Sequence, residues 1–577
     1  MLSVVAPAAR RRVRPGDSRW PSPAEWTRLR QTVSGRLIRP ESPLAACAGE
    51  AEAATCTEAL ERIVNPYYLG DEPALTQTSG WVDAWRSSPS AYAVAAESAQ
   101  DVAAAVDFAR EHDLRLVVKG GGHSYQGTSA APDSLLVGTR ALRDVTLHDA
   151  FVPEGGVGRS APRPAVSVGA GALWGHVYDA VTTRAGRYVQ GGGCTTVGVA
   201  GLVQSGGFGS HSKRYGTAAG SLLEAEVVTA DGRVRVVNEN QDPDLFWALK
   251  GGGGGTFGVV TRLTLATHAL PALFGGAWGT LRAESDAAYR ALVAEVLRFY
   301  RAELFGPHWG EQVRFEGDRS VRFQMVSQGL SQAEAEAAWG PLRAWVDGRP
   351  DVAWAEPLTV VALPAQRMWD HAFLRENVPD LVGTDDRPGA PDGNWFWNGN
   401  RGEVGQFLHG YHSAWLPAGL LGEDRVGDLA DALVAASGRW TVSLHLNKGL
   451  AGATDGALAA AADTATNPDV LGAFALAIVA GEGPPAFAGL PAPHLAKARQ
   501  SAERIRAAFD ALRAAAPETG SYVSESDYFE RDWARSFWGS NYGRLRSVKA
   551  RYDPDGLFYV RHGVGSEGWS DDGFTRT

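Results

Sequence analysis

The chain has 577 residues, of which 44% are hydrophobic and 21% charged, a composition typical of soluble globular proteins. This length predicts two domains or one interleaved pair rather than a single module. No stretch approaches the roughly 18 apolar residues that span a bilayer, so no membrane-spanning segment is expected. The net charge of −10 opposes binding to nucleic-acid backbones and to anionic membrane surfaces.

Residues 1–85 show no regular pattern and are predicted to form an N-terminal extension. A short apolar stretch precedes Arg10, Arg11 and Arg12, which reverses the charge order of a secretory signal, so no signal peptide is visible. Cys47 and Cys56 could pair if the protein is exported, leaving Cys194 unpaired, or the three thiols could be unrelated. The cysteines form no C-x-x-C pair, and no metal site is predicted.

The first regular pattern predicts a strand, a helix and a second strand. Residues 92–96 alternate as a strand does, Ser98 can cap a helix, and residues 114–119 have the composition of a buried strand. This unit ends in a glycine triplet, residues 120–122, which is followed by His123.

The same arrangement recurs farther along the chain. A strand is predicted at residues 166–170, a helix at 173–185 and an extended segment at 187–189. This second unit ends in the glycine triplet 191–193, which is followed by Cys194. Two similar units therefore each end in three glycines and a nucleophilic side chain.

A hairpin follows the second unit. Residues 222–229 and 233–237 flank an Asp-Gly turn, residues 242–249 are predicted to be a short helix, and residues 257–265 alternate as a strand. The glycine run 251–255, with the glycine at 258, matches G-x-G-x-x-G. A helix precedes this run and a strand follows it, whereas a dinucleotide fingerprint needs the opposite order, so a Rossmann site is not expected.

From about residue 272 the chain becomes rich in alanine helices and aromatic strands. The segments 406–413 and 440–447 each alternate, and the second carries an apolar face and a polar face. This pattern predicts a sheet whose back is covered by helices and whose front lines a site.

The glycine triplets can be interpreted as tight turns or as nests of backbone N–H groups that bind pyrophosphate. The presence of both, with His123 and Cys194 in matching places, favours the nests. The two side chains could instead be a satisfied loop histidine and a small buried cysteine, and they make a poor zinc site. Covalent attachment of a flavin explains the pair better, because both side chains are nucleophiles.

Four motifs are similar to the berberine-bridge-enzyme-like branch of the vanillyl-alcohol-oxidase superfamily of flavoproteins. They are GGGHSYQG at 120–127, GGGCTTVGVAGLVQSGGFG at 191–209, DLFWALKGGGGGTFGVV at 244–260 and NYGRLRSVKARYDPDGLF at 541–558. The resemblance covers most of residues 89–270 and about fifty C-terminal residues. It implies FAD bound twice, through the flavin 8-methyl carbon to His123 and through ring carbon six to Cys194.

The resemblance also implies an α+β fold with two domains. Residues 86–271 would form a two-subdomain FAD-binding module completed by the C-terminal segment 516–577, and residues 272–515 a substrate domain with an antiparallel sheet backed by helices. The residues expected to bind FAD are Gly120, Gly121, Gly122, His123, Ser124, Gly127, Gly193, Cys194, Thr195, Val197, Gly198, Gly201, Gly206, Gly207, Gly258, Val259 and Asn541.

The activity implied is that of an oxidase that transfers hydride from a sugar or another alcohol to flavin N5 and then to oxygen, giving hydrogen peroxide. Valine at 197 matches a family position that controls oxygen access and is associated with oxidases. Some members cyclise alkaloid or cannabinoid precursors, so the substrate does not carry over. A dehydrogenase with another electron acceptor and a non-catalytic flavin-containing binding protein remain alternatives.

The catalytic base is expected in the segment 522–527, which occupies the place of a family Tyr-x-Asn-Tyr-x-Asp stretch. Glu525 replaces the second tyrosine and could remove a hydroxyl proton, with Tyr522 or Tyr411 as the alternative. Weaker candidates for substrate contacts are His445, Asn447 and Trp397, each of which could equally be sheet packing. The leader also resembles that of secreted isoamyl-alcohol-oxidase-like members, so the compartment stays open.

Overall fold

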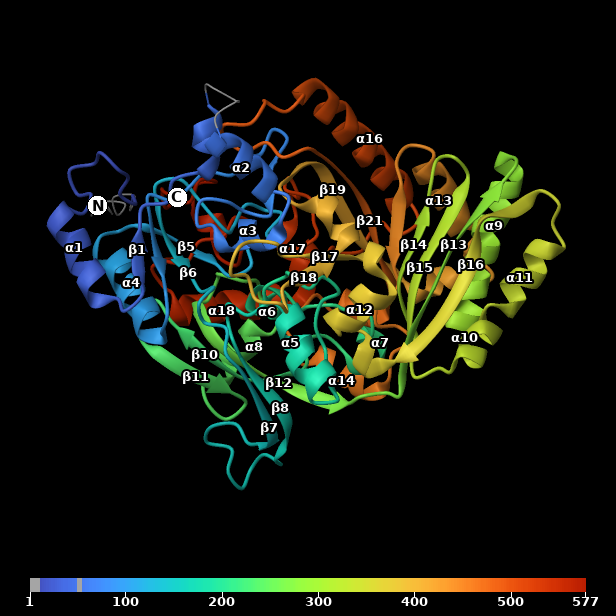
Figure 1. The fold of residues 1–577 in the computed structure, drawn as a ribbon, viewed down its shortest axis with the longest axis horizontal. Helices are drawn as coiled ribbons and strands as arrows, with labels where there is room; N and C mark the ends of the chain where they lie inside the picture. The colour runs from blue at the N-terminus through green and yellow to red at the C-terminus, as the bar shows by residue number, and fades with distance from the viewer. Residues whose placement is uncertain (1–10, 49–53) are drawn as a thin grey trace, which may run out of the picture.

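A computed structural model describes residues 11–48 and 54–577, and the apolar stretch at the start of the chain lies outside these residues. In Figure 1 the blue to green elements of the N-terminal part and the red C-terminal elements lie in one half of the molecule, and the yellow-green to orange strands of the central part form the other half. The two ends of the chain are hydrogen-bonded, because the Arg12 amide donates to the Phe574 carbonyl at 2.9 Å.

The first predicted unit is confirmed in a four-stranded sheet. Its strand order is β1 (Arg36–Ile38), β4 (Tyr92–Ala95), β6 (Ser134–Gly138) and β5 (Arg115–Lys119), and β4 and β5 both run parallel to β6. The helix between β4 and β5 is α4 (Ala99–Glu111). The Ser98 side chain accepts a hydrogen bond from the Asp101 amide, so Ser98 caps the helix as predicted.

The second predicted unit lies in a six-stranded sheet. Its strand order is β11 (Val234–Asn238), β10 (Leu222–Val228), β12 (Val259–Ala269), β8 (Arg163–Gly169) and β7 (Val145–Phe151), with β9 (Arg187–Val189) paired to the end of β12. The predicted hairpin is therefore confirmed as β10 and β11. The helix predicted at 173–185 begins as α5 (Trp174–Tyr178) and ends in a π-helical turn, Asp179–Arg184.

A nine-stranded sheet forms most of the other half. Its strand order is β16 (Val352–Pro364), β13 (Leu273–Ala283), β15 (Ser320–Gln328), β14 (Trp309–Phe315), β20 (Val442–His445), β21 (Ala473–Gly483), β19 (Gln406–Pro417), β2 (Thr78–Trp81) and β3 (Trp85–Arg86). All pairs are antiparallel except β19 with β2. Strands from the N-terminal stretch therefore complete this sheet, and the domain boundaries stay a prediction.

Helices cover the back of the large sheet. The largest apolar core packs Val442, Leu444 and Leu446 against residues of α9 (Asp286–Phe299), α13 (Val426–Ser437) and α16 (Leu495–Arg513). The front carries Tyr411, whose ring stacks on Tyr125 of the first half at 4.9 Å. A bulge between residues 408 and 410 interrupts the alternation predicted for 406–413. The helix-backed sheet is otherwise as the pattern predicted.

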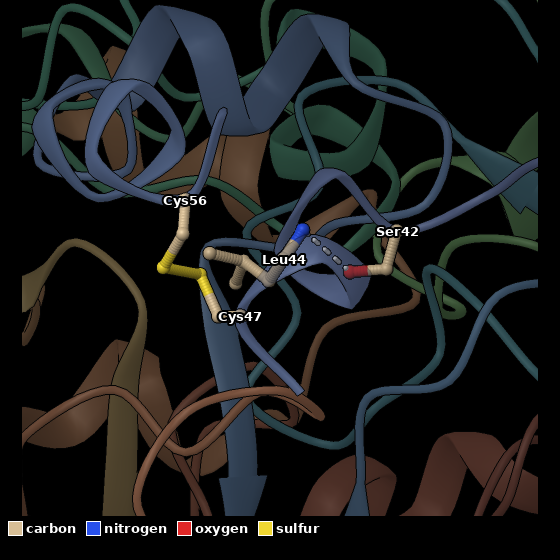
Figure 2. Close-up of a disulfide and its surroundings, with 4 residues drawn as sticks. All are labelled: Ser42, Leu44, Cys47 and Cys56. Atoms are coloured by element: carbon tan, nitrogen blue, oxygen red, sulfur yellow. Dashed lines mark hydrogen bonds between the residues drawn. A yellow bond between two sulfur atoms is a disulfide. The ribbon is translucent and has the colours of Figure 1, made fainter. Parts of the chain in front are cut away.

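The N-terminal stretch has more regular structure than predicted. It contains α1 (Pro23–Thr32), η1 (Pro43–Cys47), α2 (Ala54–Arg62) and α3 (Pro66–Asp71). Cys47 and Cys56 form a disulfide, with Cα atoms 5.0 Å apart, that ties η1 to α2 (Figure 2). Of the two alternatives left open by the sequence, the paired one is found, and Cys194 is the free cysteine.

The remaining helices are distributed over both halves of the molecule (Figure 1). They are α6 (Val199–Gln204), α7 (Ser212–Tyr215), α8 (Pro243–Leu249), α10 (Gln332–Ala338), α11 (Gly340–Asp347), α12 (His371–Asn377), α14 (Asp455–Ala462), α15 (Asp469–Gly472), α17 (Trp533–Trp538) and α18 (Tyr542–Tyr552). Within the described residues, no helix combines the length and apolar character needed to cross a membrane.

Candidate active site

The two glycine triplets follow β5 and β9, and the loops that they begin pack against each other. A side chain on Gly121 would place its Cβ 2.7 Å from the amide nitrogen of Gly198, and the reverse substitution would clash equally with Gly121. The His123 ring forms a hydrogen bond with the Thr196 backbone in the second loop. Glycine is therefore required at this contact because two backbones approach closely.

A cavity of about 300 Å³ lies where these loops meet. Eleven of the residues predicted from the sequence line it: Gly120, Gly121, Gly122, His123, Ser124, Val197, Gly198, Gly201, Gly258, Tyr522 and Glu525. The cavity thus brings together the first glycine triplet, the loop after Cys194 and the segment expected to supply the base.

Other predicted residues do not line this cavity. They are Gly127, Gly193, Cys194, Thr195, Gly206, Gly207, Val259, Asn541, Tyr411, His445, Asn447 and Trp397. Some have clear structural contacts: the Asn541 amide donates to the Thr466 carbonyl at 2.9 Å, and Val259 packs in the core beside α4. Their predicted roles are untested by this geometry.

The three expected substrate contacts lie around the Cys194 loop and the front of the sheet. The Trp397 indole nitrogen donates to the Gly193 carbonyl at 3.2 Å, and the Asn447 amide donates to the Glu311 carboxylate at 3.3 Å. Desolvation lowers the pKa of His445 well below its usual value, so its imidazole is neutral. These contacts are compatible both with packing and with substrate binding by the three residues.

The His123 imidazole is neutral in this environment. Desolvation lowers its pKa from 6.5 to about 4, outweighing the hydrogen bond to Thr196. Its Nε2 atom is buried and has no hydrogen-bond partner among the described residues. A neutral imidazole keeps one nitrogen lone pair, so the ring can act as a nucleophile.

The Cys194 thiol is held in its protonated form. Desolvation raises its pKa from 9.0 to about 12, and the carboxylates of Glu403 and Glu311 act in the same direction, while Lys448 opposes them. The sequence analysis treated Cys194 as a nucleophile, and the thiolate is the nucleophilic form of cysteine. The protein alone does not create one here, since carboxylates outnumber ammonium groups around the sulfur.

Glu525 forms an ion pair inside the cavity. The Lys448 ammonium lies 2.6 Å from one carboxylate oxygen of Glu525 and 2.5 Å from the other, and both side chains line the cavity. Their side chains are 11% and 18% exposed, so the pair is largely shielded from water. Removal from water disfavours a charged carboxylate, and a cation at hydrogen-bond distance offsets that effect.

The two alternative tyrosines remain phenols. Desolvation raises the pKa of Tyr522 and of Tyr411 far above the usual value, and the neighbouring charge of Glu525 acts in the same direction. Neither side chain can therefore hold a negative charge easily. Of the three candidates for the base, Glu525 is the one that is paired with a cation.

Several cavity-lining residues were missed by the sequence analysis. They are Lys448, which follows β20, the glycines at 253–255, and Arg561 and His562 near the C-terminus. The rejection of the dinucleotide motif was correct, because α8 precedes the glycine run and β12 follows it. The run nevertheless lines the cavity, and its small residues were the available signal. Within the described residues, no group of three or more metal-ligating side chains is present.

Comparisons of the sequence with known families agree with this geometry. A family model described as FAD binding domain matches residues 90–238, and one described as Berberine and berberine like matches residues 521–565. The FAD-linked oxidoreductase malF of Malbranchea aurantiaca is 31% identical over 97% of this chain and 93% of its own length. The VAO-type flavoprotein oxidase VAO615 of Thermothelomyces thermophilus is 30% identical over 97% and 94%.

Comparisons with solved structures show the same fold. The VAO-type flavoprotein MtVAO615 of Myceliophthora thermophila C1 matches with a TM-score of 0.79 and 26% identity, covering 98% of this chain and 100% of the other. A glucooligosaccharide oxidase of Acremonium strictum matches with a TM-score of 0.64 and 18% identity, covering 91% and 99%.

Proposed function

Because this chain belongs to the berberine-bridge-like branch of the VAO-type FAD-linked oxidoreductases, we propose that it is an oxidase of a hydroxyl-bearing substrate, a sugar or another alcohol. Hydride would leave the carbinol carbon, and oxygen would finally receive both electrons, giving hydrogen peroxide. The observation that carries this proposal is the Lys448–Glu525 ion pair in the cavity lined by His123.

The residues of the cavity fit FAD. Glycines from three separate loops line it, and their backbone N–H groups can bind pyrophosphate without a cationic side chain. The neutral His123 imidazole lines the cavity and keeps one nitrogen lone pair, which a covalent bond requires. The glucooligosaccharide oxidase of Acremonium strictum has a 6-S-cysteinyl, 8α-N1-histidyl FAD. We propose that His123 and Cys194 form the equivalent pair in this chain.

When bound, FAD supplies the two-electron acceptor that side chains lack. Glu525 would take the hydroxyl proton, since Lys448 favours its charged form. Tyr522 and Tyr411 stay neutral, so they would act as hydrogen-bond donors to the substrate oxygen or to Glu525. The roles are then distinct, because Glu525 accepts the proton, Lys448 stabilises the charge of Glu525, and the tyrosines orient the substrate.

The identity of residue 197 favours an oxidase over a dehydrogenase in this proposal, because the resemblance associates valine at this position with oxidases. Val197 lines the cavity that would hold the flavin. The position carries a branched three-carbon side chain, so a small diatomic molecule could approach where a larger side chain would block it. Hydrogen peroxide is therefore the expected co-product.

The proposal is tested with purified protein and a panel of primary alcohols, secondary alcohols and oligosaccharides. We expect at least one compound to bleach the flavin absorbance without air and to give peroxide in air. The Glu525→Gln variant, with matched flavin content, serves as the inactive control. Bleaching with slow reoxidation in air would indicate a dehydrogenase instead, and the absence of bleaching by any compound would indicate a flavin-containing binding protein.

A further inference from the structure

Both neighbours of Cys194 are hydrogen-bonded to one short strand, β18 (Trp395–Trp397), which pairs with β17 (Val382–Thr384). The Thr195 hydroxyl donates to the Trp395 carbonyl at 2.8 Å. The Trp397 indole donates to the Gly193 carbonyl at 3.2 Å. The cysteine is therefore held from both sides by this strand, although 200 residues separate Thr195 from Trp395.

The strand β18 is in turn fixed to the N-terminal helix α3. The Tyr67 hydroxyl donates to the Trp395 carbonyl at 2.9 Å and accepts a hydrogen bond from the Trp395 amide at 3.1 Å. Both residues are almost completely buried, at 0% and 1% exposure. Water cannot replace these bonds, so they fix the position of the strand.

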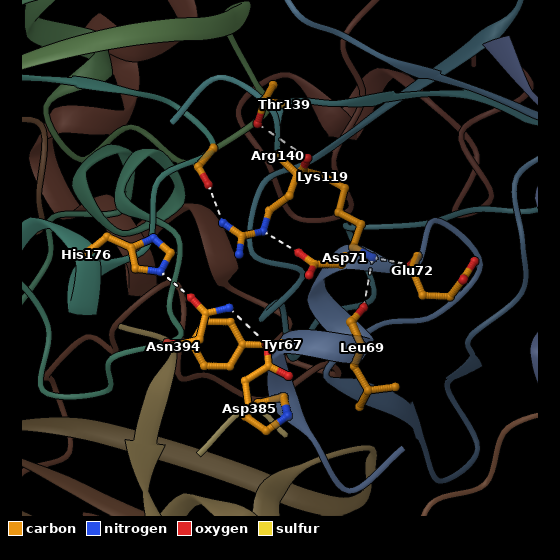
Figure 3. A network of polar contacts seen from close by, with 12 residues as sticks. Tyr67, Leu69, Asp71, Glu72, Lys119, Thr139, Arg140, His176, Asp385 and Asn394 are labelled. Atoms are coloured by element: carbon orange, nitrogen blue, oxygen red, sulfur yellow. Dashed lines mark hydrogen bonds and ion pairs between the residues drawn. The ribbon is translucent and has the colours of Figure 1, made fainter. Parts of the chain in front are cut away.

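A buried carboxylate fixes the hairpin that carries β18. The Asp385 side chain is 0% exposed and accepts hydrogen bonds from Asn65 at 2.8 Å, Arg387 at 2.8 Å and Asn394 at 2.9 Å. Burial alone would raise the pKa of Asp385, but these hydrogen bonds outweigh it and lower the pKa. The carboxylate is therefore charged and paired, and Figure 3 shows its contact with Asn394.

The same network reaches the FAD-binding half of the molecule. The Asn394 carbonyl oxygen lies 2.8 Å from the His176 ring of α5, and Arg387 donates to Asp71 at 2.8 Å. Asp71 also accepts from Arg140, which follows β6, at 2.7 Å. Figure 3 shows these side chains converging from α3, α5 and the hairpin. Side-chain contacts therefore fix the hairpin β17–β18 against the FAD-binding half, which contains the Cys194 loop.

We propose that the hairpin β17–β18 positions the Cys194 sulfur for attachment to the flavin, and that Asp385 is the positioning residue that fixes the hairpin. This inference rests on the covalent attachment proposed above. The three glycines that precede Cys194 have no side chains with which to anchor the backbone on that side of the cysteine. Because the thiol is also protonated, alignment rather than a preformed thiolate would have to favour bond formation.

The net attachment is balanced with oxygen as the oxidant. Formation of the sulfur–carbon bond removes the thiol hydrogen and one ring hydrogen, and the two electrons pass to dioxygen, which becomes hydrogen peroxide. The thiol of Cys194 is consumed in this process. Since the other two of the three cysteines form the disulfide, a thiol titration of the denatured, unreduced protein counts Cys194 alone.

The test uses Thr195→Val and Trp397→Phe, which each remove one donor and keep a similar shape. Trp440→Phe is the matched control, because it removes an indole-to-carbonyl bond of the same domain, to Ala480, that does not touch the Cys194 loop. We expect the ratio of linked to free Cys194 to fall about fivefold for each bond removed. Asp385→Asn should reduce the same ratio, and Trp440→Phe should leave it unchanged.

Mass analysis of the peptide containing His123 supplies a second readout, since its flavin content should stay at the wild-type level in every variant. A general loss of structure would lower both attachments and the melting temperature together. Full attachment of Cys194 in Asp385→Asn and in a variant that combines Thr195→Val with Trp397→Phe would overturn the positioning role. A free thiol in the wild-type holoprotein would instead overturn the proposed cysteine link itself.

Discussion

The Lys448 ammonium contacts both carboxylate oxygens of Glu525, and this ion pair faces the cavity lined by His123. Charged and titratable groups surround the pair from several elements: Cys194, Glu311, Glu403, Tyr125, Tyr411 and Tyr522. The Lys448 ammonium acts on Cys194, Glu311 and Glu403, in each case opposing the effect of the carboxylates. The charge balance of the site therefore depends in part on this pair.

Replacement of Glu525 tests its role as the base. We expect Glu525→Gln to lower kcat by roughly 10²- to 10⁴-fold with unchanged flavin content, because general base catalysis contributes about this much. Tyr522→Phe and Tyr411→Phe are the matched controls and should lower kcat less. If a tyrosine is the base, its phenylalanine variant will show the roughly 10²- to 10⁴-fold loss of kcat instead, and Glu525→Gln will stay active.

Replacement of Lys448 tests whether the ion pair holds Glu525 in place. Lys448→Met keeps the length of the side chain and removes the ammonium that contacts both carboxylate oxygens. We expect kcat/KM to fall by roughly 10- to 100-fold, because the base loses the contact that positions it in the cavity. Addition of Lys448→Met to Glu525→Gln should change the remaining activity little. A Lys448→Met variant with the wild-type kcat/KM would exclude a direct influence of Lys448 on the base.

The covalent links are tested by alanine variants of His123 and Cys194. Each single variant should keep flavin in the precipitate after acid treatment, because the other link remains. The double variant should release its flavin into the supernatant, as measured by absorbance. Flavin that still precipitates with the double variant would show that a different residue carries the bond.

Local patterns were enough to predict many elements. Alternation and the Ser98 cap located β4, α4 and β5 to within one residue at most ends. The capping box of Ser22 and Glu25 gave an equally local signal for α1, which was overlooked. The pairing of β2 with β19 had no such signal, because parallel pairing over a long sequence separation depends on the packed tertiary structure.

The part of the site that is formed by glycine loops could be predicted from the sequence. Glycine triplets indicate close backbone approach, and the first triplet, residues 120–122, does line the cavity, whereas the second, residues 191–193, does not. Lys448 gave no signal, because a single lysine after a strand is usually solvated. Its partner in the site, Glu525, is 77 residues away in the sequence, and the two side chains meet only in the folded protein.

The stability of the first glycine loop should depend on pH through Lys119. Its ammonium is buried at 4% exposure and donates to the carbonyls of Leu69, Glu72 and Leu75 at 3.1, 2.7 and 2.7 Å. Desolvation lowers the pKa of Lys119 from 10.5 to about 7, although Glu72 and Asp71 oppose the shift. A lysine whose pKa is lowered in the folded state binds its proton at a higher pH in the unfolded chain than in the folded protein.

The wild type should become less stable relative to Lys119→Met as the pH falls. As the pH falls from 10.5 to 7, the unfolded chain gains a proton at Lys119 and the folded protein does not, so the wild type loses stability relative to Lys119→Met. The loss should reach at most about 5 kcal/mol and level off below pH 7. Denaturant unfolding at pH 7, 8.5 and 10 measures it, with the exposed Lys497→Met as control. A difference that stays constant over this range would mean that Lys119 remains charged when folded, with the three carbonyls compensating for its burial.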